Sequence, residues 1–370
     1  MYCKTSNKLF LFLLPTFIIF FLFTLPVTAF GDSAFDQVIS SPALKHHQAL
    51  LEYWTPERLK NAKPMTLDIE KEATSFDPSL LEQEQAGEPF SVPPAKPAGN
   101  LPHKKSSQLP TEEMETQSLP EPFKGTYPFV YTSYRLFPNH PQMYRRYPMQ
   151  VIGKVFFTIP GEGDYVCSGS VVNTSSDSSV WTAGHCVYSP GIGWHTNFVF
   201  APSRFEGTNT YSLWSALSLV TLTGWTNGML EYDMGGAHMD NIGPYVIEDL
   251  GALGFWANTA RQQHWHAIGY PAETPFDGEH QHLCQSTWAA DDNPSGDPSA
   301  PYTVGMGCDM TGGSSGGPWV LDYSEWGGYL NGNVSYGYVG VPDQYYSPYF
   351  GDGAISVYDW LDSQPTPTLD

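Results

Sequence analysis

The sequence predicts an all-β fold from about Tyr127 onward, and two observations support that prediction. The composition includes 35 Gly, 32 Pro and 22 Tyr, which is typical of turn-rich β proteins more than of helical ones. Short runs rich in Val, Ile, Phe and Tyr follow one another between Gly, Pro, Asn and Asp: QVIGKVFFTI, YVCSGSVV, SVWTAGH, TNFVFAP and PYTVGMGC. Many short strands at close intervals indicate a barrel or a sandwich.

The N-terminal residues 1–29 have the pattern of a secretion signal. Lys4 and Lys8 precede a long apolar run that ends in the small residues Val-Thr-Ala at 27–29. An uncleaved membrane anchor is the alternative, because Leu9–Phe30 is nearly long enough to span a bilayer. We expect cleavage and a secreted protein that does not stay at the membrane.

Residues 30–146 are expected to form a largely irregular leader, which in a secreted protein suggests a propeptide. From about residue 30 to 124, Pro, Glu, Lys, Ser and Gln dominate the composition, and this stretch contains no cysteine. The exception is ALKHHQALLEYWTPERLKNA, whose apolar spacing allows a short helix around Ala49–Trp54. A linker or a stalk near the cell wall is the alternative function. At the other end, GAISVYDWLD is expected to begin as a strand and finish as a short helix, and 363–370 to be a tail.

Charge and cysteine content limit the partners and the compartment. The chain has 17 Lys and Arg and 38 Asp and Glu, a net charge of -21. This acidic balance argues against a nucleic-acid partner and suits a soluble protein outside the cell. We expect the protein to be a monomer. Cys3 leaves with the signal. The remaining Cys167, Cys186, Cys284 and Cys308 are an even number in an oxidising compartment, so two disulfides are expected.

The stretch TGGSSGGP, residues 311–318, carries the first chemical signal. Glycine pairs on both sides of two serines do not make a good helix or strand, so the hydroxyls are expected to be presented for a purpose. Gly313–Gly317 fits the G-x-S-x-G elbow of α/β hydrolases, but that fold needs a histidine after the serine. No histidine follows Ser315, so the assignment fails.

A histidine that could serve lies upstream, in VWTAGHCVY. Thr182-Ala-Gly-His185-Cys186 and GGSSGGP match two signatures of trypsin-like serine peptidases, in the family's order. From 147 to 362 the sequence resembles the chymotrypsin superfamily, and within it the secreted bacterial and fungal peptidases related to glutamyl endopeptidases. The resemblance implies two antiparallel six-stranded β-barrels, 147–245 and 246–362, and an endopeptidase that acts on proteins or peptides without a metal or organic cofactor.

The resemblance also assigns the catalytic roles. The nucleophile is the serine directly before Gly-Gly-Pro, Ser315, and His185 is the base that takes its proton. A buried aspartate must hold the histidine, and Asp233 in EYDMGGAHM suits this role. Asp240 and Asp249 are competitors in more polar, loop-like contexts.

Backbone amides and disulfides follow from the same resemblance. The amides of Gly313 and Ser315 are expected to bind the oxyanion, and a side chain at position 313 would disfavour that backbone. Cys167 and Cys186 match the family's pair that holds the histidine loop. Cys284 and Cys308 then remain for each other.

The specificity pocket is less clear from sequence. Asp309 lies at the offset from Ser315 where trypsin places the aspartate that binds Arg or Lys, yet in the glutamyl branch an acid there does not select basic side chains. In NVSYGY, the residues Ser335, Tyr336 and Gly337 match the strand that pairs with substrate, and Gly353 is expected to line the opposite wall. Glutamyl endopeptidases typically place a histidine on this strand, and none is present.

The residue beside the nucleophile bears on how the protein would be activated. Animal trypsins mature through an aspartate at the position of Ser314, so that ionic switch is absent here. A zymogen would then need its leader to inhibit or to assist folding by another route. We expect maturation between Lys124 and Tyr147, with Arg145-Arg146 as one candidate.

Two rival functions remain, a catalytically inactive binding module on the same fold and a surface-anchored adhesin.

Four histidines stand in alternating pairs that could bind a metal. We instead expect them to be ordinary surface histidines: His264, His266, His280 and His282.

Overall fold

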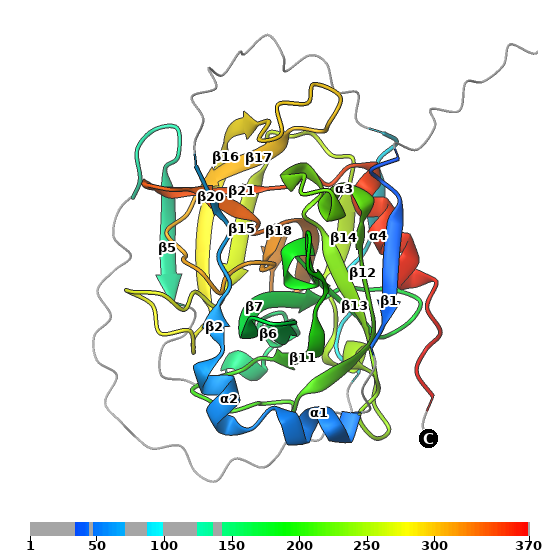
Figure 1. Ribbon diagram of the computed structural model, residues 1–370. Coiled ribbons are helices and arrows are strands. Elements are labelled where there is room, and N and C mark those ends of the chain that lie inside the picture. Colours follow the sequence, from blue (N-terminus) through cyan, green and yellow to red (C-terminus); the bar gives the residue numbers. More distant parts are fainter. Residues whose placement is uncertain (1–33, 44–46, 71–86, 99–123, 136–142, 369–370) are drawn as a thin grey trace, which may run out of the picture. The chain divides into compact units, whose positions relative to one another are not determined.

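The computed structural model in Figure 1 describes residues 34–43, 47–70, 87–98, 124–135 and 143–368, and strands dominate it. The predicted all-β fold is confirmed. The described residues form one folded unit. The proposed signal, residues 1–29, and its anchor alternative lie outside the described residues. Among the residues that the structure describes, no helix is long and apolar enough to cross a membrane.

The first barrel is a closed ring of six antiparallel strands. Its members are β6 (Ile152–Ile159), β7 (Gly163–Val171), β8 (Ser179–Thr182), β11 (Thr196–Pro202), β12 (Trp214–Leu222) and β13 (Gly235–Met239). The pairing order is β12-β11-β6-β7-β8-β13, and β13 returns to pair with β12, which closes the ring. Buried β-branched and aromatic side chains fill it, among them Val155, Phe157, Val180 and Phe200.

The second barrel closes through one bent strand. Its strands are β15 (His264–Gly269), β16 (His282–Asp292), β17 (Thr303–Gly307), β18 (Pro318–Ser324), β19 (Gly327–Asn333), β20 (Tyr336–Tyr338) and β21 (Val341–Ser347). The ladder runs β20-β21-β17-β16-β15-β18-β19. Only Val334 and Ser335 separate β19 from β20, so the two act as one strand that joins both ends of the ladder. The strand β14 (Gly254–Ala257) adds to β19 in parallel.

The leader contributes short elements to both barrels. Its described elements are β1 (Val38–Pro42), α1 (His47–Tyr53), α2 (Pro56–Asn61), β2 (Lys63–Pro64), β3 (Asp68–Ile69), β4 (Phe90–Val92) and β5 (Tyr131–Arg135). The first barrel receives β1 on β12 and β2 on β7, while the second receives β3 on β20, β4 on β14 and β5 on β16. The helix expected around Ala49–Trp54 is confirmed as α1.

Helices α1 and α2 are anchored on the outside of the first barrel. Leu50, Trp54 and Leu59 are buried against a cluster that includes Phe156 and Val199. Trp54 also donates its indole N–H to the carbonyl of Asn197 at 2.7 Å. Thr55 caps α2, and Pro56 occupies its first turn, where a missing N–H costs nothing.

The C-terminal segment corrects one expectation. GAISVYDWLD lies within a single helix, α4 (Asp352–Asp362), without an initial strand. Its buried side chains are Ala354, Val357, Tyr358 and Leu361, and their spacing of one, three and four residues is helical. The remaining helical turns are α3 (Thr223–Thr226) and the 3₁₀ turns Met143–Arg145, Met149–Val151, Gly184–Cys186, Leu230–Tyr232 and Ile247–Leu250. Two strands, β9 (Tyr188–Ser189) and β10 (Gly193–Trp194), form a small hairpin.

Both expected disulfides are present. Cys167 pairs with Cys186, 19 residues along the chain, and Cys284 with Cys308, 24 residues along. Closing loops of this length stabilises a fold by about 3 kcal/mol each in the chain-entropy model. The first bridge joins β7 to the turn that carries His185.

A buried glutamate should make the stability of the fold depend on pH. Burial raises the pKa of Glu248 to about 8, although Thr174 and Ser179 donate hydrogen bonds to its carboxylate. A carboxyl whose folded pKa is raised stabilises the fold most at low pH, where it is protonated, and loses that contribution as pH rises toward 8. We expect the free energy of unfolding to fall by roughly 2–4 kcal/mol between pH 5 and 8.

The matching variant is Glu248→Gln, which is neutral at every pH and keeps the shape. Urea unfolding at a series of pH values should give a flatter profile for this variant than for the parent. Identical slopes in both proteins would show that Glu248 is ionised throughout.

Candidate active site

His185 lies on a buried 3₁₀ turn, Gly184–Cys186, directly after β8. The disulfide from Cys186 to β7 holds one end of the turn. Gly184 lets the chain approach closely, because a Cβ there would lie 2.8 Å from the Trp225 ring and 3.0 Å from Asp233 Oδ1. The histidine is therefore held in place by its backbone as well as by its ring.

Asp233 faces His185 from the start of β13 and is fully buried. Its Oδ1 accepts the His185 backbone N–H at 2.7 Å, and its Oδ2 accepts the ring Nδ1–H at 2.7 Å. Because a carboxylate only accepts, the hydrogen sits on Nδ1, which leaves Nε2 as a proton acceptor. Nε2 has no hydrogen-bond partner among the described residues.

The structure separates Asp233 from its two competitors. Asp240 accepts from the neighbouring Asn241 N–H at 2.9 Å, and Asp249 accepts from Val246 N–H at 3.1 Å. Neither carboxylate is hydrogen-bonded to His185, so Asp233 is the acid that reaches the histidine.

The second barrel supplies further donors to the same aspartate. Ser335 Oγ donates to Asp233 Oδ2 at 2.5 Å, and Asn333 Nδ2 donates to the Asp233 backbone carbonyl at 3.3 Å. Trp181 in β8 holds Asn333 in turn, through its indole N–H at 3.1 Å. The sequence predicted Ser335 only as part of a substrate-pairing strand, and nothing in the spacing indicates that its hydroxyl supports Asp233.

The Ser315 turn is held against the first barrel by Ser168 of β7. Ser168 N–H donates to the Ser315 carbonyl at 2.7 Å, and its Oγ donates to the Gly313 carbonyl at 2.9 Å. Gly313 has φ +93°, a conformation that favours glycine, as the sequence predicted. Gly316 has φ +78°, and a Cβ there would lie 2.6 Å from the Ser168 carbonyl.

The two adjacent serines point in different directions. Ser314 Oγ donates back into its own turn, to the Thr311 carbonyl at 2.7 Å. Ser315 Oγ donates to the carbonyl oxygen of Met65, in the leader, at 3.2 Å. The same oxygen accepts Gly313 N–H at 2.7 Å. One main-chain carbonyl of the leader therefore accepts hydrogen bonds from both the Gly313 N–H and the Ser315 hydroxyl.

A pocket of ≈ 340 Å³ lies beside this turn. It is lined by Thr66, Asp68, Glu273, Asp309, Met310, Thr311, Gly312, Gly337, Tyr338, Gly340, Val341, Pro342, Asp343, Gln344 and Tyr345. Four of these lining residues are acidic, and no Lys, Arg or His is among them. Asp309 Oδ2 accepts from Ser133 Oγ at 2.8 Å and lies 3.1 Å from Lys124 Nζ.

The predicted substrate-pairing residues are only partly placed as expected. Gly337 lines the pocket, and its N–H donates to the Leu67 carbonyl of the leader at 3.1 Å. The Tyr336 side chain is buried in the second barrel, where its hydroxyl donates to Asp292 at 2.8 Å. Only the main chain of Tyr336 is left to face a substrate.

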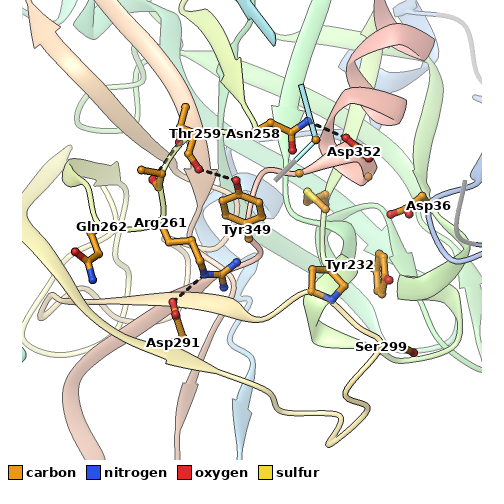
Figure 2. A pocket seen from close by; sticks show the side chains of 16 residues that line it. Asp36, Tyr232, Asn258, Thr259, Arg261, Gln262, Asp291, Ser299, Tyr349 and Asp352 are labelled. Atoms are coloured by element: carbon orange, nitrogen blue, oxygen red, sulfur yellow. Dashed lines mark hydrogen bonds and ion pairs between the residues drawn. The ribbon is translucent and has the colours of Figure 1, made fainter. Parts of the chain in front are cut away.

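Gly353 corrects another expectation, because it does not line the pocket beside Asp309. It lies in α4 and lines a different pocket of ≈ 480 Å³, shown in Figure 2. Some polar side chains of that pocket are paired, as Arg261 with Asp291 at 3.1 Å and Tyr349 with the Thr259 carbonyl at 2.6 Å. None of His185, Asp309 and Ser315 is among its described lining residues. The expectation for Gly353 assumed a strand where the chain is a helix.

The four alternating histidines do not form a shared cluster. His264 and His266 lie on β15 with their ring centroids 5.6 Å apart. His280 pairs with Asp277 at 2.7 Å, and burial lowers the pKa of His282 to about 4. In the part of the chain that the structure describes, the groups of three metal-ligating side chains all contain disulfide-bonded cysteines.

Two serine proteases are among the solved structures that this chain resembles. The thermostable serine protease AL20 from an extremophilic microorganism is 39% identical, with a TM-score of 0.53 over 58% of this chain and 98% of that one. Protease Anisep from Arthrobacter nicotinovorans is 37% identical, with a TM-score of 0.54 over 58% of this chain and 96% of that one. No protein-family model matches the sequence.

A shorter match comes from a curated relative. An extracellular metalloprotease of Bacillus subtilis (strain 168) is 38% identical over 72 residues, 19% of this chain. The match spans only 22% of that protein's length.

Ser335→Ala tests the support of the buried carboxylate. The variant removes one donor from Asp233, and leaving a buried charged acceptor short of a partner costs about 1–3 kcal/mol. We expect a loss of that size in the free energy of unfolding, measured in urea. Ser356→Ala, at a partly exposed position of α4, is the control and should change stability by less than about 0.5 kcal/mol. An equal effect of both substitutions would contradict the role of Ser335.

Proposed function

Because the chain belongs to the chymotrypsin-like family of serine peptidases, we propose that it is an endopeptidase with a triad of Ser315, His185 and Asp233. The observation that carries the proposal is the buried pair of His185 and Asp233. Two 2.7 Å hydrogen bonds set the ring orientation and leave Nε2 free to accept a proton. Ser315 and Gly313 supply the remaining parts of the site on the second barrel.

The mechanism follows from these positions. His185 Nε2 takes the proton of Ser315 Oγ as that oxygen attacks the scissile carbonyl carbon. The C–N bond then breaks, the leaving nitrogen takes the proton from His185, and an acyl-enzyme remains on Ser315. Water, deprotonated by His185, attacks the ester, and Ser315 recovers its proton as the acid product leaves. Asp233 stays ionised and stabilises the charged imidazolium.

The Met65 carbonyl supports the placement of the oxyanion site. A carbonyl oxygen already accepts Gly313 N–H at 2.7 Å and the Ser315 hydroxyl at 3.2 Å. Donors held at such distances by the backbone stabilise the negative oxygen that forms during attack, and losing one costs about 10²- to 10³-fold in rate. We propose the Gly313 and Ser315 amides as these donors.

We also propose that the protein is exported. The signal-like N-terminus and the two disulfides support an oxidising compartment. An inactive binding module and an adhesin are the competing functions, and the hydrogen-bonded His185–Asp233 pair favours an enzyme over both.

Three substitutions test the triad. Ser315→Ala, His185→Ala and Asp233→Asn should each lower kcat/KM for peptide hydrolysis by roughly 10³-fold or more. A fluorophosphonate probe should label the parent at Ser315 and leave Ser315→Ala unlabelled, as read by peptide mass spectrometry. Ser314→Ala is the matched control, because this neighbouring hydroxyl bonds only within its own turn. Equal rates of hydrolysis by the parent and Ser315→Ala would contradict the proposed mechanism.

For specificity, we propose that the pocket takes a Lys or Arg side chain. Three acidic residues outside the leader line it, Glu273, Asp309 and Asp343, and a lysine, Lys124, already lies 3.1 Å from Asp309. An acidic lining would repel the side chain of a glutamate substrate.

Asp309→Asn tests that preference with nearly the same shape. Losing a charge-assisted contact should lower kcat/KM for cleavage after Lys or Arg by roughly 10- to 100-fold. A peptide library digested by both proteins and read by mass spectrometry gives the measurement. A parent signature of cleavage after glutamate would contradict the proposal.

A further inference from the structure

Residues 63–69 of the leader cross the site described above. We propose that this segment is an inhibitory strap, which lies across the cleft in the direction opposite to that of a substrate and blocks Ser315 without being cut. The inference rests on the proposed peptidase function. It goes beyond it by assigning the segment that occupies the site and its orientation.

The strap first contacts the first barrel. Strand β2, Lys63–Pro64, pairs in parallel with Tyr165 and Val166 of β7. Met65 N–H then donates to the Val166 carbonyl at 2.9 Å. Figure 1 shows this blue segment rising from α2 through β2 toward β20.

At its middle, the strap occupies one of the two proposed oxyanion donors and the hydroxyl of the nucleophile. The Met65 carbonyl accepts from Gly313 N–H and from Ser315 Oγ. Because the serine donates its proton to this carbonyl, the proton is not directed to His185. His185 Nε2 accordingly has no partner among the described residues, and the relay from serine to histidine is not formed.

Beyond Met65 the strap lies along the second barrel. Strand β3, Asp68–Ile69, pairs in parallel with Gly337 and Tyr338 of β20. Gly337 N–H donates to the Leu67 carbonyl at 3.1 Å, and Val339 N–H to the Ile69 carbonyl at 3.0 Å. Thr66 and Asp68 line the acidic pocket.

The direction of the strap explains why it would resist cleavage. In the proposed reaction the residue before the scissile bond fills the pocket, so the acyl part of a substrate lies along β20. The strap places the opposite part there, since the residues after the Met65 carbonyl run along β20 and those before it run along β7. The leaving nitrogen of a Met65–Thr66 cleavage would thus lie on the acyl side. The proposed mechanism protonates the leaving nitrogen on the opposite side of the scissile bond.

A remote anchor holds the strap in place. Leu50, Trp54 and Leu59 are buried on the first barrel. Arg58 pairs with Asp164 at 2.7 Å, and the Tyr53 hydroxyl donates to the same carboxylate at 2.6 Å. Helices α1 and α2 therefore add buried apolar contact area to that of the partly buried strap side chains Met65, Leu67 and Ile69.

The test uses the full chain with the leader attached and measures the rate at which a fluorophosphonate probe labels Ser315. Leu67→Asp places a charge on the half-buried strap side chain, and Met65→Pro removes the N–H that bonds to Val166. Asn61→Asp adds the same charge at an exposed position of α2 and is the control. We expect both strap variants to be labelled at least about tenfold faster than the parent and the control. Intact mass, measured at the start of labelling, verifies that no leader has been removed.

A second arm supplies the strap as a separate molecule. A synthetic peptide of residues 47–70 should slow labelling of the Leu67→Asp variant, and the same peptide carrying Leu67→Asp should not. Equal labelling rates for parent and strap variants would contradict the inhibitory role of the strap and would leave the proposed peptidase function unaffected. Cleavage of the parent after Met65 would overturn the reversed direction. No labelling of any of these proteins would instead overturn the proposed function.

Discussion

The buried carboxylate of Asp233 is the constraint on which the rest of the site depends. A charge taken out of water costs several kcal/mol unless donors surround it. The first barrel meets that need with the backbone and ring N–H groups of His185, and the second with the hydroxyl of Ser335. Neither barrel alone satisfies the carboxylate, so the interface between them and the orientation of the histidine are set by the same requirement.

A similar sharing of partners holds the serine turn. Ser168 of β7 donates to the carbonyls of Gly313 and Ser315, both in the second barrel. With those carbonyls engaged, the Gly313 N–H is left to face the cleft, and the oxygen it meets belongs to Met65. The leader thus completes, in the uncut chain, hydrogen bonds that the proposed reaction would give to substrate.

Local signals in the sequence predicted the parts of the site that depend on short motifs. Thr182–Cys186 and GGSSGGP indicated His185 and Ser315, and the more polar, loop-like contexts of Asp240 and Asp249 favoured Asp233. Other features depend on tertiary contact and leave no local pattern. Strands of two residues, such as β2 and β3, are too short for any periodicity, so the course of the leader could not be predicted. Gly353 was misplaced because a short apolar run fits either a strand or a helix until its neighbours are known.

The covalent attachment of the strap has a consequence for concentration. While residues 63–69 remain part of the chain, they face the cleft at an effective concentration set by the tether, on the order of millimolar for short linkers. One cut between Glu70 and Gly87 would leave every contact of the strap intact and yet turn its binding into an association between two molecules. Its occupancy would then fall with dilution, so that dilution by itself would free the cleft.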